Sequence, residues 1–431
     1  MAQARAVTAG VRRVSPGVAA RGATLAGIVG AVLVATSACA ADPASRPISA
    51  PAMSLQPIVP ALAGARLEPV PFAALDGWTA DDHAAAFATF RASCAALKTP
   101  PKEVGPPSVP TLARGLRRAC AAAARLGPTA PSTRLARLFF EANFRAWRVV
   151  PDGGDGGYYT GYYEPEVEGS LQPGNGFDVP VYGRPDDLLM TGPGATPNSG
   201  PAFRREGDAL LPYHDRAAIE DGALAGRGLE IVWLKDPIDL FFMQIQGSAR
   251  VRLPDGRILR LGYDGFNGQP YLPVGRLLIQ RGLVPREEMS MARIRAFMEA
   301  DPEAGRALRR ENRAFAFFKA LPLGDDKGAM GAQGVPLTAG RSLAVDRKLH
   351  TYGTPIFVEA DLPLSAPGAA EPFRRLMIAQ DTGSAIVGPA RADLFFGAGD
   401  AAGAVAGRIR HRGVFTMLVP RFAPVDSGGA P

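Results

Sequence analysis

Two aspartates flank a glycine-punctuated turn in the stretch MIAQDTGSAIVGPARADLFFG, residues 377–397. Asp381 directly follows an apolar run, and Asp393 stands on the far side of the turn. Carboxylates beside buried β-structure are costly unless they are paired, hydrogen-bonded or used in chemistry. Partial burial would raise the pKa of Asp381 and keep part of it protonated, as a general acid requires. It could equally be a turn residue that accepts hydrogen bonds from the amides of Thr382 and Gly383, and local sequence leaves both interpretations open.

Tyrosine and glutamine side chains cluster in stretches that favour β-structure. The stretches GYYTGYYEPEVEGS and DLFFMQIQGSARV hold Tyr158, Tyr159, Tyr162, Tyr163, Gln244 and Gln246. Alternation in the second stretch predicts a strand with Phe242, Gln244 and Gln246 on one face. Aromatic rings stack on the C–H face of a pyranose, while amides and hydroxyls bond to its hydroxyl groups. The pattern favours a sugar-binding groove, although any one of these tyrosines could instead border a core.

Cleavage of a sugar chain would also need an acid, since a carboxylic acid usually protonates the glycosidic oxygen. Other chemistries lack their sequence signals. The four histidines are scattered and no Cys or His pair has ligand spacing, so we expect no metal site. Neither a P-loop nor a nucleotide-binding glycine fingerprint predicts a cofactor, and the G-x-S-x-G nucleophile elbow is missing. The formal charge of +7 falls to about +3 when the four arginines before residue 22 are discounted, so no nucleic-acid partner is indicated.

Residues 1–39 have the layout of a secretory signal peptide. An uncharged, mostly apolar segment follows four arginines and ends in small residues before Cys39. The segment is shorter than the roughly 20 residues that a membrane span needs. ATSAC resembles the bacterial lipoprotein signal, in which the cysteine becomes the lipidated first residue, but Ala38-Cys39-Ala40 also fits ordinary cleavage. We therefore expect export, followed by a flexible Pro-, Ala- and Ser-rich tether over residues 40–72.

An even pair of cysteines, Cys94 and Cys120, remains once Cys39 is lipidated or removed. Thiols in an oxidising compartment tend to pair, so we expect a disulfide between them. Two buried free thiols are the alternative.

Three helices are predicted near the start of the folded region, over residues 80–97, 111–126 and 132–146. The third would place Leu135, Leu138, Phe139 and Ala142 on one face.

Beyond Trp147 the chain turns to short β-favouring segments with Gly, Pro and Asp-Gly turns, which suggest a small antiparallel barrel or sandwich. VRLPDGRILRL is the clearest hairpin, with Pro-Asp-Gly at its tip. A helical interlude is expected over residues 274–318, where Ser290 could cap the amphipathic stretch MSMARIRAFMEA. Residues 335–420 return to β-character.

Several stretches, taken in order, resemble the membrane-bound lytic murein transglycosylase A family. They are TGYYEP, DLFFMQIQGSARVRLPDG, YDGFNGQPY, MSMARIRAF, NRAFAFFK, VDRKLHTYGTPIF, MIAQDTGSAIVGPARADLFFG and GVFTMLVP. The resemblance implies a mainly β protein with N-terminal helices, in which a double-psi β-barrel domain carries an inserted smaller β-barrel domain and a substrate groove lies between them. The double-psi domain would comprise residues 73–165 and 312–420, with the insert at 166–311 and a tail at 421–431.

The resemblance also implies roles for individual residues. Asp381 falls at the position of the family's catalytic acid, and Asp346, Asp381 and Asp393 match its three-aspartate domain. Asp346 and Asp393 would support the barrel and orient the site. The groove would be lined by Thr160, Tyr162, Gln246, Gly247, Ser248 and Gly383.

The implied activity is non-hydrolytic cleavage of peptidoglycan glycan strands at the bond that follows N-acetylmuramic acid, which leaves a 1,6-anhydro ring. The enzyme would act in the periplasm of a Gram-negative bacterium, as an outer-membrane lipoprotein if Cys39 is lipidated. Two alternatives stay open: a polysaccharide hydrolase with Asp393 or Asp346 as base, and a non-catalytic, expansin-like wall-binding protein. The enzyme class that the resemblance implies is a peptidoglycan lytic exotransglycosylase.

Overall fold

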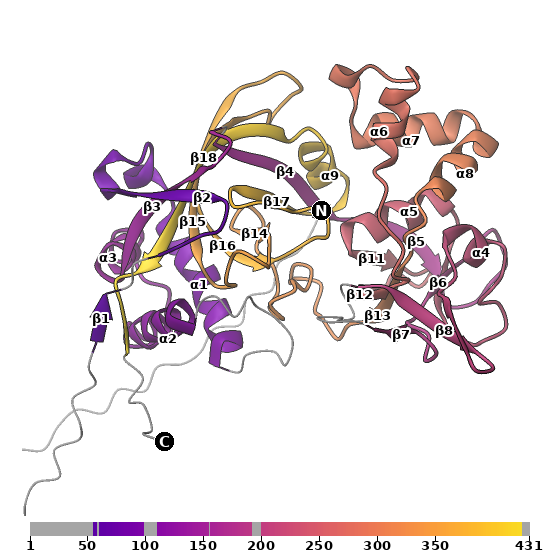
Figure 1. Ribbon diagram of the computed structural model, residues 1–431, viewed down its shortest axis with the longest axis horizontal. Helices are drawn as coiled ribbons and strands as arrows, with labels where there is room; N and C mark the ends of the chain where they lie inside the picture. Colours follow the sequence, from indigo (N-terminus) through magenta and orange to yellow (C-terminus); the bar gives the residue numbers. More distant parts are fainter. Residues whose placement is uncertain (1–54, 58–59, 99–109, 155, 192–199, 425–431) are drawn as a thin grey trace, which may run out of the picture. The chain divides into compact units, whose positions relative to one another are not determined.

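The computed structural model describes residues 55–57, 60–98, 110–154, 156–191 and 200–424 (Figure 1). The chain divides into two units, Met1–Ala52 and Met53–Pro431, and all that follows concerns the second. The expected signal peptide, Cys39 and most of the expected tether lie outside the described residues. Within the described ranges, no helix combines the length and apolar character that crossing a membrane requires.

Six strands of the first domain close into a barrel. Their order around it is β15-β16-β14-β17-β4-β18, and β18 pairs again with β15. The strands are β4 (Gly157–Glu164), β14 (Ser342–Val345), β15 (Pro355–Leu362), β16 (Glu371–Asp381), β17 (Arg391–Ala398) and β18 (Arg410–Pro420). Two of the pairings are parallel, β14 with β16 and β17 with β4, so strands far apart in sequence end at the same rim of the barrel.

Two further strands extend the sheet from β18, namely β3 (Phe144–Pro151) and β2 (Ala65–Val70). The predicted tether over 40–72 is therefore wrong for residues 65–70, which pair with β3 along their whole length. Leu67 and Val70 pack against the core, and the backbone beside them must bond to another strand in place of water. At the other end, part of the predicted tail is also paired, because β19 (Phe422–Pro424) joins β1 (Leu55–Pro57).

Helices pack against this barrel, and three of them confirm those predicted near the N-terminus. They are α1 (His83–Lys98), α2 (Pro110–Ala124) and α3 (Thr133–Asn143), with the short α9 (Gly399–Ala406) against β4 and β17. A disulfide between Cys94 and Cys120, with Cα atoms 5.5 Å apart, joins α1 to α2.

The predicted apolar face of α3 is wrong except for Phe139, which is buried as predicted. Leu135 and Leu138 are 43% and 45% exposed, and the buried side chains are Ala136, Phe139 and Phe140. The spacing of these three residues defines a helix face in which two adjacent phenylalanines reach the core. Burying both rings together removes more apolar surface from water than burying the two leucines would.

The second domain is a sheet of six strands in the order β13-β12-β11-β5-β10-β6. An isolated bridge between Gly183 and Phe318 closes β6 onto β13, so this sheet also forms a small barrel. The strands are β5 (Glu166–Ser170), β6 (Val179–Tyr182), β10 (Glu230–Leu234), β11 (Ser248–Arg252), β12 (Ile258–Phe266) and β13 (Ala316–Ala320). The prediction of a β-rich fold with two barrels and N-terminal helices is confirmed. β13 belongs to the second barrel, although the sequence assigned residues 312–420 to the first domain.

Smaller elements complete this domain. They are a three-stranded sheet of β7 (Leu189–Met190), β8 (Ala202–Glu206) and β9 (Ala209–Pro212), and the helices α4 (Arg216–Glu220), α5 (Pro237–Gln246), α6 (Val274–Gln280), α7 (Met291–Ala300) and α8 (Pro302–Glu311). Short 3-10 turns occupy Phe72–Ala74, Trp78–Ala80 and Arg286–Glu288. The hairpin predicted in VRLPDGRILRL is confirmed by the antiparallel pairing of β11 with β12, and Ser290 caps α7 as predicted.

The predicted strand in DLFFMQIQ is wrong, because these residues form helix α5. Asp236 caps the helix by accepting a hydrogen bond from the Ile238 amide, and Pro237 occupies the first turn. Gly247 ends it with a φ of 81°, a left-handed conformation that glycine adopts without steric cost. These end signals indicate a helix. The spacing of the apolar and polar residues alone fits both a helix and a strand.

A buried ion-pair cluster fixes the connection between the two barrels. Glu164 is the last residue of β4, and its carboxylate accepts hydrogen bonds from Arg260 at 2.8 Å and from Arg250 at 2.9 Å. Glu164 and Arg260 are each 1% exposed. Arg260 belongs to β12 and Arg250 to β11, both in the second barrel. Their bonds to Glu164 therefore hold these two strands at the end of β4, where the chain passes from the first barrel to the second.

Candidate active site

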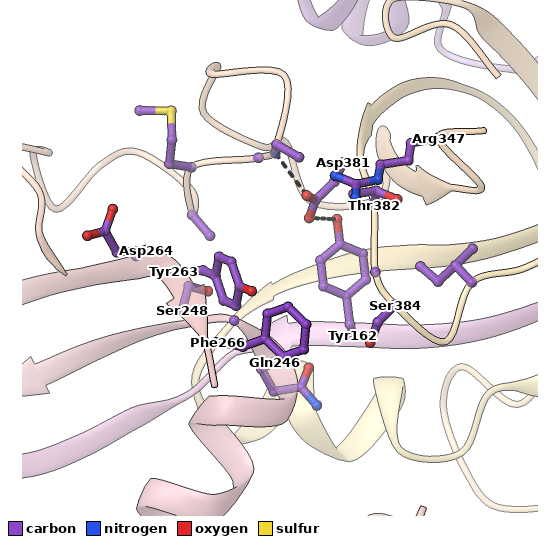
Figure 2. Close-up of a pocket in the computed structure, with 18 of the residues that line it drawn as sticks. Tyr162, Gln246, Ser248, Tyr263, Asp264, Phe266, Arg347, Asp381, Thr382 and Ser384 are labelled. Atoms are coloured by element: carbon purple, nitrogen blue, oxygen red, sulfur yellow. Dashed lines mark hydrogen bonds between the residues drawn. The ribbon is translucent and has the colours of Figure 1, made fainter. Parts of the chain in front are cut away.

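A pocket of about 870 Å³ is lined by residues of both barrels (Figure 2). The first barrel contributes the loops after β14 and β16 and the segment around residues 329–337. The second contributes the end of α5, the start of β11 and the middle of β12. The strand ends of a rigid barrel thus carry one wall, and a helix terminus with a hairpin carries the other.

Asp381 is the last residue of β16 and projects into this pocket. One carboxylate oxygen accepts a hydrogen bond from the Tyr162 hydroxyl and the other accepts one from the Ala332 amide, each at 2.9 Å (Figure 2). Burial raises the pKa of Asp381 to about 6, because desolvation outweighs these hydrogen bonds, and repulsion from Asp393 adds to the rise. Near neutral pH the residue can therefore hold a proton and release it.

Tyr162 lies on β4 and lines the pocket next to Asp381. Its ring packs against Phe395, with ring centroids 5.2 Å apart, and this contact fixes the direction of the hydroxyl. Burial first, and then the Asp381 carboxylate, hold the pKa of Tyr162 well above its usual value. The hydroxyl therefore stays protonated and donates to Asp381.

Asp393 and Thr160 lie beside the pocket rather than in its wall. In the barrel Asp393 pairs with Ala344 on one side and with Thr160 on the other, and Ala344 also stands opposite Asp381. Arg391 donates to the Asp393 carboxylate at 2.8 Å and to the Thr160 hydroxyl at 2.6 Å. Thr160, expected to line the groove, does not contribute to the pocket lining and instead contacts Arg391. Burial raises the pKa of Asp393 even though Arg391 opposes the rise.

Asp346 lines the pocket but turns its carboxylate toward the backbone. It is 6% exposed, and its two oxygens accept hydrogen bonds from the amides of Lys348 and Gly388, each at 2.9 Å. These bonds tie the loop after β14 to the loop after β16. The arrangement is that of a carboxylate that shapes two loops.

The remaining expected groove residues, Gln246, Gly247, Ser248 and Gly383, all line the pocket. Gln246 ends α5, and its side-chain oxygen accepts a hydrogen bond from the Tyr163 amide at 3.1 Å, which fixes the helix end against β4. The structure thus brings these four residues and Asp381 to one cavity from two barrels.

Sequence reasoning did not find the Ala332 amide, because any residue supplies a backbone N–H. Its position depends on Gln333, whose amide donates to the Gln380 carbonyl at 3.0 Å and whose side-chain oxygen accepts from the Ser93 hydroxyl at 2.8 Å. Gln380 donates to Ser93 at 2.7 Å and accepts from Ser342 at 2.5 Å. Ser93, Gln333, Gln380 and Ser342 are all buried. This buried network joins α1 to the two residues that flank the acid and its amide donor.

Two cations at the pocket were also missed, Arg347 and Lys348. They follow Asp346 directly, so a basic pair beside a site aspartate was the available signal. Within the described ranges, no group of three or more His, Cys, Asp or Glu side chains is arranged to hold a metal ion.

Family comparisons agree with both barrels. A family model described as the MltA specific insert domain matches residues 158–319, and one described as the 3D domain matches residues 341–419. A membrane-bound lytic murein transglycosylase A from Vibrio cholerae is 38% identical over 273 residues, which make up 62% of this chain and 67% of that protein. Its Escherichia coli K12 counterpart is 34% identical over 276 residues, or 63% of this chain and 68% of that protein.

Solved structures are similar over more of the chain. A membrane-bound lytic murein transglycosylase from Agrobacterium tumefaciens has a TM-score of 0.74 and 36% identity, with 82% of this chain and 98% of that chain covered. Escherichia coli MltA with bound chitohexaose has a TM-score of 0.58 and 27% identity, with 86% and 95% covered. With two matching domains and relatives of this identity and coverage, the chain belongs to the membrane-bound lytic murein transglycosylase A family.

Proposed function

We propose that this protein is a lytic transglycosylase that cuts peptidoglycan glycan strands between N-acetylmuramic acid and N-acetylglucosamine, in cell-wall remodelling and turnover. The observation that carries the proposal is Asp381: a single carboxyl group with a pKa of about 6, held by two hydrogen bonds in a pocket that both barrels line. A group with that pKa is suited to act first as an acid and then as a base at neutral pH.

In the first step, protonated Asp381 gives its proton to the glycosidic oxygen. The bond between this oxygen and C1 of the muramic acid breaks as positive charge develops at C1. The carboxylate that remains is stabilised by the Tyr162 hydroxyl and the Ala332 amide, which already point at it.

In the second step, the 6-hydroxyl of the same sugar attacks C1 and closes the 1,6-anhydro ring. Its proton passes to Asp381, which returns to the acid form. No water enters the balance, and the nucleophile belongs to the reacting ring, so the protein does not have to bring in a second molecule.

The other pocket carboxylates are committed elsewhere, which supports a mechanism with one carboxyl group. Asp346 bonds to two backbone amides, and Asp264 pairs with Lys319 at 2.9 Å and with Arg184 at 3.7 Å. A hydrolase that activates water would need a second carboxylate free for that work.

The groove residues then have separate tasks. Gln246, Gly247, Ser248 and Gly383 would hold the sugar rings, and Tyr162 would contact the sugar while it stabilises Asp381. Thr160 would act on the groove only through Arg391, and Asp346 and Asp393 would support the barrel loops.

The Vibrio and Escherichia coli relatives are named membrane-bound, and we extend this to a membrane-associated bacterial protein here. The finer placement is an outer-membrane lipoprotein anchored through Cys39 and facing the periplasm, with a soluble periplasmic product as the alternative if Cys39 is removed.

The test is to digest purified sacculi in water enriched in oxygen-18 and to weigh the muropeptides. A transglycosylase yields anhydro products that are one water lighter than hydrolysed ones and carry no heavy oxygen. Products that contain heavy oxygen at the new sugar end would overturn the proposal in favour of a hydrolase.

A further inference from the structure

Arg347 and Lys348 are two cations of the pocket that the proposed reaction does not use. Both line the pocket, in the loop directly after β14, and Figure 2 shows Arg347 beside the pocket. Arg347 is half-buried and Lys348 is exposed. Among the described residues, neither side chain makes a hydrogen bond or an ion pair with an acid, whereas Lys319 and Arg184 both pair with Asp264.

The carboxylates near these two cations are already satisfied. Asp346 is the nearest in sequence, but its oxygens accept from the amides of Lys348 and Gly388. Asp264 carries one negative charge, so it neutralises at most one of its two partners, Lys319 and Arg184. With Asp381 protonated, as the acid step requires, the pocket carries excess positive charge at Arg347 and Lys348.

Arg347 is also not arranged to stabilise the Asp381 carboxylate. Among the described residues, the Asp381 carboxylate accepts its hydrogen bonds from the Tyr162 hydroxyl and the Ala332 amide, and Arg347 makes no ion pair with it. The charge of Arg347 instead acts on the hydroxyls of Tyr263 and Tyr352, whose pKa values it lowers against a larger rise from burial. A half-buried arginine without an acidic partner in the chain is suited to an anion that arrives with the substrate.

We infer that Arg347 and Lys348 form an anion subsite that binds a carboxylate carried by the muramic acid residue of the glycan. The inference rests on the proposed function and narrows its substrate. The sugar backbone of the glycan is uncharged, so the anion must be a substituent of the muramic acid. Two groups supply this chemistry: the lactyl carboxylate of peptide-free muramic acid, and the carboxylates of an attached stem peptide. A guanidinium can bind either one through two parallel hydrogen bonds, and the ammonium adds a second charge.

The experiment measures binding by calorimetry in full-length Asp381→Asn protein, so that the glycan is not cut. The probes are chitohexaose, which is neutral, peptide-free glycan strands, and strands with stem peptides. The variants are Arg347→Gln, Lys348→Gln and the charge-preserving Arg347→Lys. Arg117→Gln is the matched control, since Arg117 is exposed on α2 and does not line the pocket.

We expect Arg347→Gln to lower the affinity for carboxylate-bearing strands about ten-fold or more. Lys348→Gln should lower this affinity less, and Arg347→Lys should retain part of it. The affinity for chitohexaose should stay within about two-fold, and the salt dependence of strand binding should decrease. A loss confined to peptide-free strands identifies the lactyl carboxylate, and a loss confined to peptide-bearing strands identifies the stem peptide.

Two results would overturn the inference: an equal loss for chitohexaose, or unchanged affinity for both kinds of strand. Either would leave the proposed function standing, because the release of anhydro products by the unsubstituted enzyme is measured separately.

Discussion

Replacing Tyr162 with phenylalanine removes one of the two hydrogen bonds that hold the Asp381 carboxylate. The ring remains to pack against Phe395, so the change is confined to one hydroxyl. That hydroxyl donates at 2.9 Å and favours the ionised form of Asp381. Its loss must raise the pKa of Asp381 further above 6.

The size of the effect follows from the bond that is lost. A hydrogen bond to a charged group contributes about 1.5–3 kcal/mol, and each pKa unit corresponds to about 1.4 kcal/mol. Because the pocket is open to water, which can replace part of the lost bond, the low end applies. We expect the pKa of Asp381 to rise by about one unit.

The assay is the pH profile of kcat/KM, since a general acid must be protonated in the free enzyme. For the unsubstituted enzyme, kcat/KM should fall as the pH rises through about 6. In Tyr162→Phe this fall should move about one pH unit upward, whatever happens to the maximal rate. Tyr158→Phe is the matched control, because Tyr158 lies on the same strand, is exposed and does not line the pocket. A fall that stays in place, or moves downward, would refute the assignment of Asp381 as the acid.

Three further predictions follow from the same geometry. Asp393→Asn should move the fall of kcat/KM to lower pH, opposite to Tyr162→Phe, because it removes a repulsion that raises the pKa of Asp381; an upward shift would contradict this. Asp381→Asn should raise the free energy of unfolding by about 2–3 kcal/mol above pH 6 and leave it unchanged below pH 4, because a raised pKa gives stability that is lost as the group ionises. Urea unfolding at pH 3.5 and 7.5 checks it, and an equal gain at both would contradict it. Gln333→Leu should free the Ala332 amide and move the fall of kcat/KM upward. An unchanged pH profile in Gln333→Leu would contradict a role for this buried network in positioning the Ala332 amide.

Much of the fold could be predicted because local signals and tertiary contacts agree. Ser290, the Pro-Asp-Gly tip and the alanine-rich helices form elements for reasons that lie within a few residues. The errors had two causes: burial decided the strand over 65–70 and the buried face of α3, whereas the end residues decided α5. The strand over 65–70 exists because Leu67 and Val70 face the core, and α5 is a helix because of its end residues rather than its polar spacing.

The candidate site likewise has features that the sequence showed and features that it did not. The position of Asp381 at the end of an apolar run was visible in the sequence, as was the clustering of Gln246 with Ser248. The contacts that give Asp381 its pKa were not visible, because Tyr162 and the Ala332 amide reach it from 219 and 49 residues away in sequence. The parallel pairing of β14 with β16 likewise joins Asp346 to the loop after β16, and no local pattern encodes that register.

If one carboxyl group serves as both acid and base, its removal must abolish the reaction, and the release of anhydro-muropeptides from purified sacculi by Asp381→Asn measures this. The variant should therefore release no anhydro products while it sediments with sacculi as fully as the unsubstituted enzyme does. Continued release of anhydro products by a folded, sacculus-bound Asp381→Asn protein would contradict the claim and require a different acid in the pocket.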